Sequence, residues 1–250
     1  MVGRLDNGRS NQSFLLDSSG TRIVLRLNST TTLLPGANRL AEAEIWQAAS
    51  ARGIAPPLLY VDTQAGFLVS TFIADHLPPQ AQTEDTVLDQ VFDLLARCHS
   101  LEVDVPVMDY AQHIERYWKI INSSGTTPGN TLTRQRGPML ELLESLLNKD
   151  TQRGLCHHDP IPANFVGTAD RLYLIDWEYA AEGLVVMDYA ALGVEWGIAD
   201  EVVVARSGME PESLAMAKDL YRYLCALWQA VAAWPNISPR QTPDQVRGDK

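Results

Sequence analysis

Over the first 75 residues the apolar positions occur in short runs of the kind that form β-strands. The runs 13–17 and 22–27 flank a Ser-Ser-Gly-Thr sequence, whose small polar residues and glycine favour a hairpin turn. Two further strands are predicted over 58–62 and 66–72, again around a short turn. The pattern therefore predicts two strand pairs near the N-terminus.

Residues 37–52, between these strand pairs, change to a helical period. Gly53 follows them, and a glycine in that place is a common stop signal for a helix. The apolar positions that share one face of this helix are Leu40, Ile45, Ala48 and Ala49. The predicted order of elements is strand, strand, helix, strand, strand.

Helical patterns dominate the rest of the chain. A Pro-rich polar stretch, 75–83, is predicted to link two lobes. Apolar stripes at helical spacing then predict helices over 87–98, with Thr83 as a candidate N-terminal cap, and over 139–147 and 214–234.

The segment 154–179 interrupts this helical pattern. Two brief apolar runs, 164–166 and 172–175, are joined by Gly-Thr-Ala-Asp and predict a small hairpin. Loops held on a rigid scaffold commonly carry binding and catalytic groups. We therefore expect the chemistry of the protein in this segment.

Composition narrows the possible functions. The 250 residues include 20 Lys and Arg against 31 Asp and Glu, for a formal net charge of −11, and 46% are hydrophobic, which is ample for a folded core. Proteins that bind nucleic acids cluster Lys and Arg against the phosphates, and this chain has no such cluster. We expect no nucleic-acid partner.

The cysteines and the N-terminus indicate a location. Cys98, Cys156 and Cys225 are widely spaced and form no C-x-x-C pair, so neither a disulfide framework nor a cysteine-based zinc site is expected. The first residues lack the apolar region of a signal peptide, and no apolar run approaches the about 18 residues of a membrane span. We expect a cytoplasmic protein with no membrane partner. These patterns set no oligomeric state.

Four polar residues in the interrupting segment have the spacing of phosphotransfer chemistry. His157 and Asp159 are followed by Asn164, and Asp176 comes at the end of the second predicted hairpin strand. Protein-kinase-type phosphotransferases use this H-x-D-x-x-x-x-N pattern with a later strand-terminal Asp. Such chemistry needs a carboxylate to orient and deprotonate the attacking hydroxyl, and hard oxygen ligands to hold Mg²⁺ on the triphosphate. Asp159, Asn164 and Asp176 supply these groups.

Through residues 157–165 (HHDPIPANF) and 174–180 (LIDWEYA), the chain resembles the aminoglycoside phosphotransferase and choline kinase superfamily, and most closely its choline, ethanolamine and thiamine kinase branch. The resemblance implies a two-lobed α+β fold of the protein-kinase type. Residues 1–75 would form a small β-rich nucleotide-binding lobe, and residues 76–250 a larger, mainly helical catalytic and acceptor-binding lobe. It also implies an enzyme that transfers the γ-phosphate of ATP, with Mg²⁺, to a hydroxyl of a small molecule.

The resemblance extends to the N-terminal region. Residues 7–13 resemble the phosphate loop of the family, which implies nucleotide contacts from Gly8, Ser10 and Asn11, although the loop is not G-x-G-x-x-G. Arg26 takes the place of the phosphate-pairing Lys of the third strand. Its expected helix partner is Glu42, with Glu44 as the alternative.

Roles in the catalytic segment follow from the same resemblance. Asp159 would act as base, Asn164 and Asp176 would hold Mg²⁺, and His157 would brace the catalytic loop. Asp188 matches a family Asp at a helix start, where an N-cap or a loop-bracing role is natural. The alternative interpretation is an Asx-rich loop that only makes turns.

The acceptor is expected to be a small cation of the choline, ethanolamine or thiamine type. Aromatic rings can hold such a cation through their faces, and the candidates are Tyr117, Trp118, Trp177, Tyr179, Trp196, Trp228 and Trp234. Of these we assign Trp177 and Trp196, together with Glu178, to the acceptor. Residues 76–250 hold 14 basic and 25 acidic residues, whereas residues 1–75 are balanced, so the field of the second lobe favours a cation.

Three alternatives stay open. The protein could be an aminoglycoside or sugar kinase of the same superfamily, or a catalytically silent nucleotide-binding protein. His158 and Asp159 also suggest a metal-dependent phosphohydrolase of the HD type, but the strand predicted over 172–175 and the lack of a second His pair disfavour it.

Overall fold

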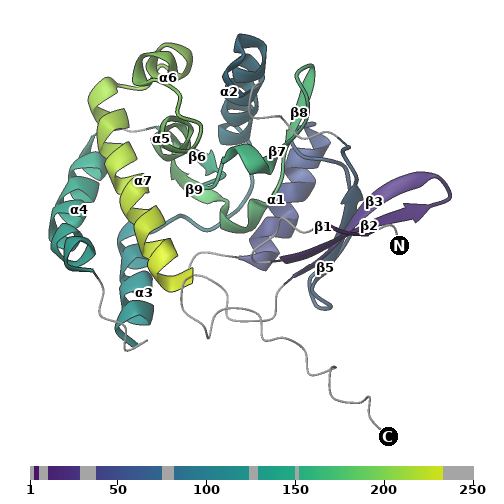
Figure 1. Ribbon diagram of the computed structural model, residues 1–250, viewed down its shortest axis with the longest axis horizontal. Coiled ribbons are helices and arrows are strands. Elements are labelled where there is room, and N and C mark those ends of the chain that lie inside the picture. Colours follow the sequence, from purple (N-terminus) through teal and green to yellow (C-terminus); the bar gives the residue numbers. More distant parts are fainter. Residues whose placement is uncertain are drawn as a thin grey trace, which may run out of the picture.

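The computed structural model confirms the expected α+β fold. It describes residues 3–5, 11–28, 38–74, 82–123, 129–149 and 152–232. A β-sheet with one helix forms the N-terminal region, and helices form most of the remainder (Figure 1). The segment 154–179, which is the functional segment, lies between these two regions.

The N-terminal sheet is antiparallel, with the strand order β1-β2-β3-β5-β4. Its strands are β1 (Gly3–Leu5), β2 (Asn11–Ser18), β3 (Thr21–Asn28), β4 (Leu58–Asp62) and β5 (Phe67–Thr71). Ser19 and Gly20 between β2 and β3 both have positive φ, as a tight two-residue hairpin requires. The two predicted strand pairs are confirmed. The strand β1 was not predicted, because three residues are too few to show an alternating period.

Helix α1 (Arg39–Ala51) lies between the strand pairs, as the sequence predicts. The Asn38 side chain caps its first turn by accepting a hydrogen bond from the amide of Ala41. Gly53 ends it with a φ of 66°, a conformation that glycine adopts without strain. The buried face of α1 includes Glu42 among apolar residues. A buried carboxylate needs a charged partner, which points to the site described below.

The remaining helices are α2 (Asp85–His99), α3 (Tyr110–Ser123), α4 (Asn130–Asn148), α5 (Val185–Glu195), α6 (Asp200–Ser207) and α7 (Pro211–Ala232). Helix α7 packs against α3, α4 and α5 (Figure 1). Thr83 was predicted wrongly as the cap of α2, because Glu84 occupies that position and makes no side-chain cap hydrogen bond. The described part of the chain contains no helix that is both long and apolar enough to cross a membrane.

Two small two-stranded sheets frame the functional segment. Strands β7 (Phe165–Thr168) and β8 (Arg171–Leu174) form the predicted hairpin, which is confirmed. Strands β6 (Arg153–Cys156) and β9 (Ala181–Leu184) pair across it and were not predicted, since each has only four residues and its partner is distant in sequence. The expected lobe boundary at residue 75 lies outside the described residues and stays a prediction.

Close packing of β6 on the end of α2 yields a stability prediction. A Cβ atom added to Gly154 would lie 2.4 Å from the carbonyl oxygen of His99, whereas one added to Gly137 in α4 would meet nothing within 4 Å. We expect Gly154→Ala to lower the free energy of unfolding by about 1–3 kcal/mol. The control Gly137→Ala should be neutral or stabilising by up to about 1 kcal/mol, because alanine favours a helix. Urea unfolding of both variants measures the difference, and equal midpoints would contradict the packing argument.

Candidate active site

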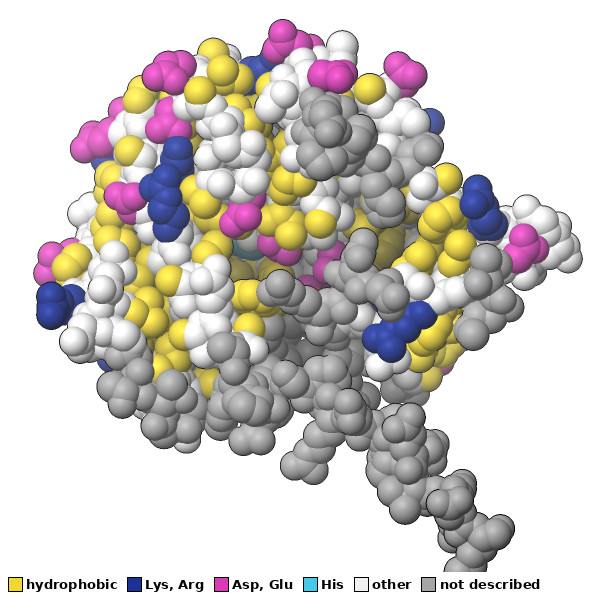
Figure 2. Space-filling view, viewed as in Figure 1, with side chains coloured by type: hydrophobic (Ala, Val, Ile, Leu, Met, Phe, Trp, Pro, Cys, Tyr) yellow, Lys and Arg dark blue, Asp and Glu magenta, His cyan; other side chains and the backbone are white. Residues whose placement is uncertain are grey.

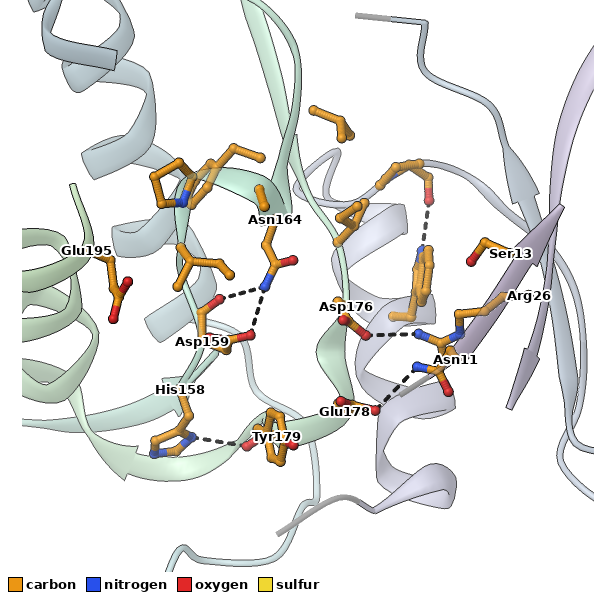
Figure 3. A pocket seen from close by; sticks show the side chains of 18 of the residues that line it. Asn11, Ser13, Arg26, His158, Asp159, Asn164, Asp176, Glu178, Tyr179 and Glu195 are labelled. Carbon is orange, nitrogen blue, oxygen red and sulfur yellow. Dashed lines mark hydrogen bonds and ion pairs between the residues drawn. The ribbon is translucent and has the colours of Figure 1, made fainter. Parts of the chain in front are cut away.

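A cavity of about 1090 Å³ lies between the N-terminal sheet and the helical region. Ser13 and Arg26 line it from the sheet, and Asp159, Asn164 and Asp176 line it from the functional segment. Figure 3 shows the sheet residues on one side of the cavity and Asp159 on the other. Acidic side chains are visible in the hollow on this face of the molecule (Figure 2).

Hairpin β7–β8 brings Asn164 and Asp176 to the same place. Asn164 directly precedes the first strand and Asp176 follows the second, and the amide of Ile175 donates to the carbonyl oxygen of Asn164 at 2.9 Å. Because the two ends of an antiparallel hairpin lie side by side, the twelve-residue spacing becomes a short distance in space. The hairpin is thus the reason why this spacing matters.

Asp159 is held by Asn164. The Nδ2 group of Asn164 donates to the Asp159 carbonyl oxygen at 2.8 Å and to its Oδ2 at 3.0 Å. The amide nitrogen is therefore turned toward Asp159, and in Figure 3 the amide oxygen lies on the side of Asp176. The structure brings the three residues of the predicted motif together as a cluster of oxygen atoms at the cavity wall.

Asp176 has a left-handed backbone, with φ 67° and ψ 64°. A non-glycine residue rarely adopts this conformation, which costs about 1–3 kcal/mol and persists where surrounding contacts hold it. Its Oδ1 lies 3.3 Å from the Nη1 of Arg26, an ion pair that joins the functional segment to β3.

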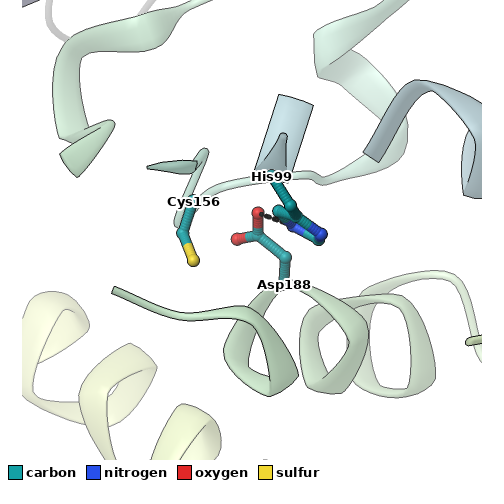
Figure 4. A group of neighbouring side chains, drawn as sticks. All are labelled: His99, Cys156 and Asp188. Carbon is teal, nitrogen blue, oxygen red and sulfur yellow. Dashed lines mark hydrogen bonds and ion pairs between the residues drawn. The ribbon is translucent and has the colours of Figure 1, made fainter. Parts of the chain in front are cut away.

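The loop before Asp159 is anchored on Asp188. The buried Asp188 carboxylate accepts hydrogen bonds from the amides of His157 and His158, both at 2.8 Å, and from the Nε2 of His99 at 3.0 Å (Figure 4). Burial opposes ionisation, but the hydrogen bond from His99 prevails and lowers the pKa of Asp188. Of the two expected roles, loop bracing matches these contacts. The N-cap role is wrong, because Leu184 is the cap of α5.

His157 is fully buried behind the loop. Its Nε2 donates to the carbonyl oxygen of Ile175 at 3.0 Å, and burial lowers its pKa to about 4. The imidazole is therefore neutral at pH 7 and ties the Asp159 loop to the strand that precedes Asp176. These contacts match the bracing role that the resemblance implies. Cys156 lies beside His99 and Asp188, but that carboxylate already accepts three hydrogen bonds, and the group is part of the anchor.

Arg26 forms a buried ion pair with Glu42. Its Nη2 lies 2.5 Å from the Glu42 Oε1, and both side chains are nearly inaccessible to solvent. Glu44 is exposed, so the contact belongs to Glu42. The Arg26 guanidinium also lies over the ring of Trp46, with 5.5 Å to the ring centroid. The pair places the arginine at the cavity wall, where it also meets Asp176.

Arg39 joins the same network, although sequence analysis assigned it no role. Its Nη1 lies 2.9 Å from the Oε2 of Glu42, and its Nη2 lies 3.0 Å from the Oε2 of Glu178. Its Nη2 also donates to the Oδ1 of Asn11 at 2.8 Å. The only sequence signal was its place in the first turn of the helix that carries Glu42.

Asn11 and Glu178 were expected to contact nucleotide and acceptor, respectively. Both line the cavity, and their side chains meet each other, with 3.3 Å from the Nδ2 of Asn11 to the Oε2 of Glu178 (Figure 3). Gly8 and Ser10, the other two residues that were expected to contact the nucleotide from the phosphate loop, lie outside the described residues.

Trp177 and Trp196 were assigned wrongly to the acceptor, because neither belongs to the cavity wall among the described residues. Trp177 is completely buried, donates to the carbonyl oxygen of Leu174 at 3.2 Å and packs edge-on against His157. The indole N–H of Trp196 donates to the carbonyl oxygen of Pro160 at 2.8 Å. Both indoles brace the loops from behind, since each satisfies a buried backbone carbonyl.

Other aromatic residues form the end of the cavity beyond Asp159. They come from α3, α7 and the 3-10 turn η3 (Trp177–Tyr179), and they are Tyr117, Tyr179, Tyr221 and Trp228. Glu195, at the end of α5, faces the same space (Figure 3). Tyr221 and Glu195 were not predicted from the sequence, because their place in the cavity wall depends on how the helices pack. Of the other candidates, Trp118 is buried, its indole donating to the Tyr223 hydroxyl, and Trp234 lies outside the described residues.

His158 links this aromatic end to the catalytic loop. The amide of Leu184 donates to the Tyr110 hydroxyl at 3.0 Å, so the hydroxyl proton is directed to the Nε2 of His158 at 2.8 Å. The Nδ1 of His158 then donates to the carbonyl oxygen of Tyr179 at 3.2 Å. Burial lowers the pKa of His158, in agreement with a neutral ring. Gly183 permits this contact, because a Cβ there would lie 2.6 Å from both the imidazole and the Tyr110 hydroxyl.

Burial and a neighbouring carboxylate raise the pKa of two acidic residues of the cavity. Burial, followed by the charge of Asp176, raises the pKa of Asp159 to about 8. Burial and the charge of Glu178 raise the pKa of Asp176 to about 6, although Arg26 opposes this. The ionised forms of these two carboxyls are therefore disfavoured in spite of the neighbouring arginines, and a cation bound beside them would favour the ionised forms.

Two curated relatives are similar in sequence. Thiamine kinase from Escherichia coli O81 (strain ED1a) is 28% identical over 256 residues, which cover 98% of this chain and 85% of the relative. Protein LicA from Haemophilus influenzae is 28% identical over 189 residues, or 74% of this chain. The match spans 55% of the length of that relative.

Solved structures share the fold. Choline kinase LicA from Streptococcus pneumoniae superposes with a TM-score of 0.75 at 21% identity, covering 91% of this chain and 83% of that one. A choline/ethanolamine kinase family protein from Mesorhizobium loti gives a TM-score of 0.71 at 24% identity, with coverages of 91% and 76%. These similarities confirm the kinase-like fold expected from the sequence. A model of the phosphotransferase enzyme family matches residues 2–234, and the chain belongs to that family.

Proposed function

We propose that this protein transfers the γ-phosphoryl group of ATP to a hydroxyl of a small cationic molecule. The observation that carries the proposal is the cluster of Asp159, Asn164 and Asp176 at the wall of a cavity that has arginine on one side and aromatic residues on the other. Relatives named thiamine kinase and choline kinase support the reaction class, and a solved LicA structure with AMP supports nucleotide use.

Asp159 is proposed as the base that orients the acceptor hydroxyl and takes its proton. A pKa of about 8 places this carboxyl near the operating pH, where a general base is most effective. The hydrogen bonds from Asn164 fix its direction, and Asp188 with His157 fix the loop that carries it. Arg26, presented by β3 and oriented by Glu42, is proposed to donate to the nucleotide phosphates.

Asn164 and Asp176 are proposed to hold Mg²⁺. They offer an amide oxygen and a carboxylate, the hard ligands that this ion prefers, and the raised pKa values of Asp159 and Asp176 support a cation beside these carboxyls. When bound, the ion supplies neutralisation of the charge that develops on the phosphates.

The end of the cavity beyond Asp159 supports a cationic acceptor. Tyr117, Tyr179, Tyr221 and Trp228 present aromatic surface, and Glu195 adds a carboxylate. Aromatic faces attract cations such as quaternary ammonium groups, and a nearby carboxylate strengthens that preference. The balance of charge favours choline, ethanolamine or thiamine type acceptors over neutral sugars.

Acceptor-dependent ADP release tests the reaction. The panel contains choline, ethanolamine, thiamine, glucose and kanamycin, each with MgATP. We expect turnover above the ATPase background with at least one of the first three. Binding of MgATP without acceptor-dependent ADP release across the panel would overturn the proposal in favour of a silent nucleotide-binding protein. Turnover with glucose alone would overturn a cationic acceptor, and turnover with the polycation kanamycin alone would overturn the choline, ethanolamine or thiamine type in favour of an aminoglycoside.

Asp159→Asn tests the base. We expect it to remove most turnover, by at least about 100-fold, while MgATP affinity stays nearly unchanged. Turnover at the wild-type rate would exclude Asp159 as the base. Asp104→Asn, at an exposed position, is the matched control and should retain full activity.

The same variant should be more stable than the wild type without Mg²⁺. Because the folded pKa of Asp159 is raised, its favourable contribution is present at low pH and is lost as the pH rises from about 4 to about 8. We therefore expect the melting temperature of Asp159→Asn to exceed that of the wild type by about 2–4 °C at pH 8, with the difference shrinking toward pH 4. Differential scanning fluorimetry across this range measures it, and a difference independent of pH would contradict the electrostatic argument.

Glu195→Gln tests the cationic acceptor. Loss of this carboxylate should raise the KM for a cationic acceptor about tenfold, equivalent to about 1.4 kcal/mol, with little change in kcat. Glu201→Gln, exposed on α6, is the control. An unchanged KM in Glu195→Gln would show that the acceptor cation does not approach α5.

A further inference from the structure

Four side chains of alternating charge, three of them buried and one, that of Arg39, half-buried, run from the sheet to the functional segment. Arg26 of β3 meets Glu42 of α1, Glu42 meets Arg39 of the same helix, and Arg39 meets Glu178 of the turn η3. Each distance is 3.0 Å or less. The chain of contacts therefore crosses from the N-terminal region to the turn that follows Asp176.

A backbone contact accompanies the last of these ion pairs. The amide of Asn38, the cap residue of α1, donates to the carbonyl oxygen of Glu178 at 3.1 Å. Both the side chain and the backbone of Glu178 are thus in contact with the start of α1. The first turn of this helix and the turn η3 form a docked pair.

Asp176 depends on this docking. It has the left-handed backbone conformation that needs outside support, and its own side chain is about one-third exposed and forms one ion pair within the described residues, at 3.3 Å from Arg26. Glu178 lies two residues further on, in the turn that Asp176 begins. Movement of that turn away from α1 would carry the Asp176 carboxylate with it.

We propose that Arg39 and Glu178 are a positioning pair that holds Asp176 in place for nucleotide binding, so that Glu178 acts on the nucleotide side of the cavity and not on the acceptor. This inference rests on the proposed function, in which Asp176 serves MgATP. The Oε2 of Glu178 already meets both Arg39 and Asn11, which lie on the N-terminal side of the cavity. A guanidinium fork suits this role, because Arg39 reaches Glu42, Glu178 and Asn11 at once.

A double-mutant cycle with Arg39→Gln, Glu178→Gln and the double variant tests the pair. The affinity for MgATP is measured by calorimetry without acceptor, at several Mg²⁺ concentrations, and the acceptor KM is measured separately. We expect each single variant to weaken MgATP binding about tenfold and to need more Mg²⁺, with the acceptor KM changed less than about twofold. The double variant should lose no more MgATP affinity than the more impaired of the two single variants, because the effects of residues that act as one unit are not additive.

Conservative variants separate positioning from folding. Arg39→Lys and Glu178→Asp keep the charges. The first replaces the guanidinium fork by a single ammonium group, and the second shortens the acidic side chain. We expect both variants to lose MgATP affinity to an intermediate degree and to keep the circular dichroism spectrum of the wild type. Glu42 keeps its contact with Arg26 in every variant, and in Arg39→Gln the Glu178 carboxylate keeps the hydrogen bond from Asn11, so neither buried carboxylate is left without a partner. Arg52→Gln, an exposed arginine at the other end of α1, should bind MgATP as the wild type does.

Three results would overturn the pair. One is a rise in the acceptor KM of Glu178→Gln at unchanged MgATP affinity, which would show that Glu178 serves acceptor binding. Another is a loss in Glu178→Gln that Arg39→Gln does not reproduce, and the third is additive losses in the double variant. Because MgATP binding is measured without acceptor, these outcomes remain distinct from a failure to find a phosphorylated acceptor.

Discussion

Four carboxylates crowd together at the centre of the molecule, and the contacts around them offset their repulsion. Asp159, Asp176, Glu42 and Glu178 converge there from three separate segments, with burial and mutual repulsion raising the pKa of the first two. Such a cluster is unfavourable by itself, because buried like charges repel. Arg26 and Arg39 offset part of the charge, and the two arginines, from β3 and α1, also link the N-terminal region to the functional segment.

Because this cluster opposes folding, its loops are held firmly from behind. The buried Asp188 carboxylate accepts hydrogen bonds from two loop amides and from the His99 ring. The His157 ring donates a hydrogen bond to the carbonyl oxygen of Ile175, which directly precedes Asp176. The indoles of Trp177 and Trp196 donate to backbone carbonyls of the same loops. Stability is thus contributed by neutral or fully satisfied polar groups away from the cavity, while the cavity keeps uncompensated charge for its ligands.

Local patterns predicted the parts of the fold that have a clear period. The hairpin β2–β3, helix α1 and the hairpin β7–β8 all show an apolar repeat bounded by turn or stop residues. The strands β1, β6 and β9 were not predicted, because β1 has only three residues, and β6 and β9, unlike the equally short β7 and β8, are not joined by a turn but pair far along the chain. Thr83 was misjudged for a related reason, because cap preference alone does not place the first residue of a helix.

In the candidate site, the local constellation of catalytic residues was predictable from the order of the amino acids. Asp159, Asn164 and Asp176 sit on one loop and one hairpin, so their spacing is a property of a short stretch of chain. Contacts between distant segments were decided only by the tertiary structure. It selected Glu42 over Glu44, turned Trp177 and Trp196 into the core and brought Arg39 to Glu178 and Glu195 to the cavity. The physical reason is that helix packing sets which face of each helix meets the cavity, and residue spacing along the chain does not encode that orientation.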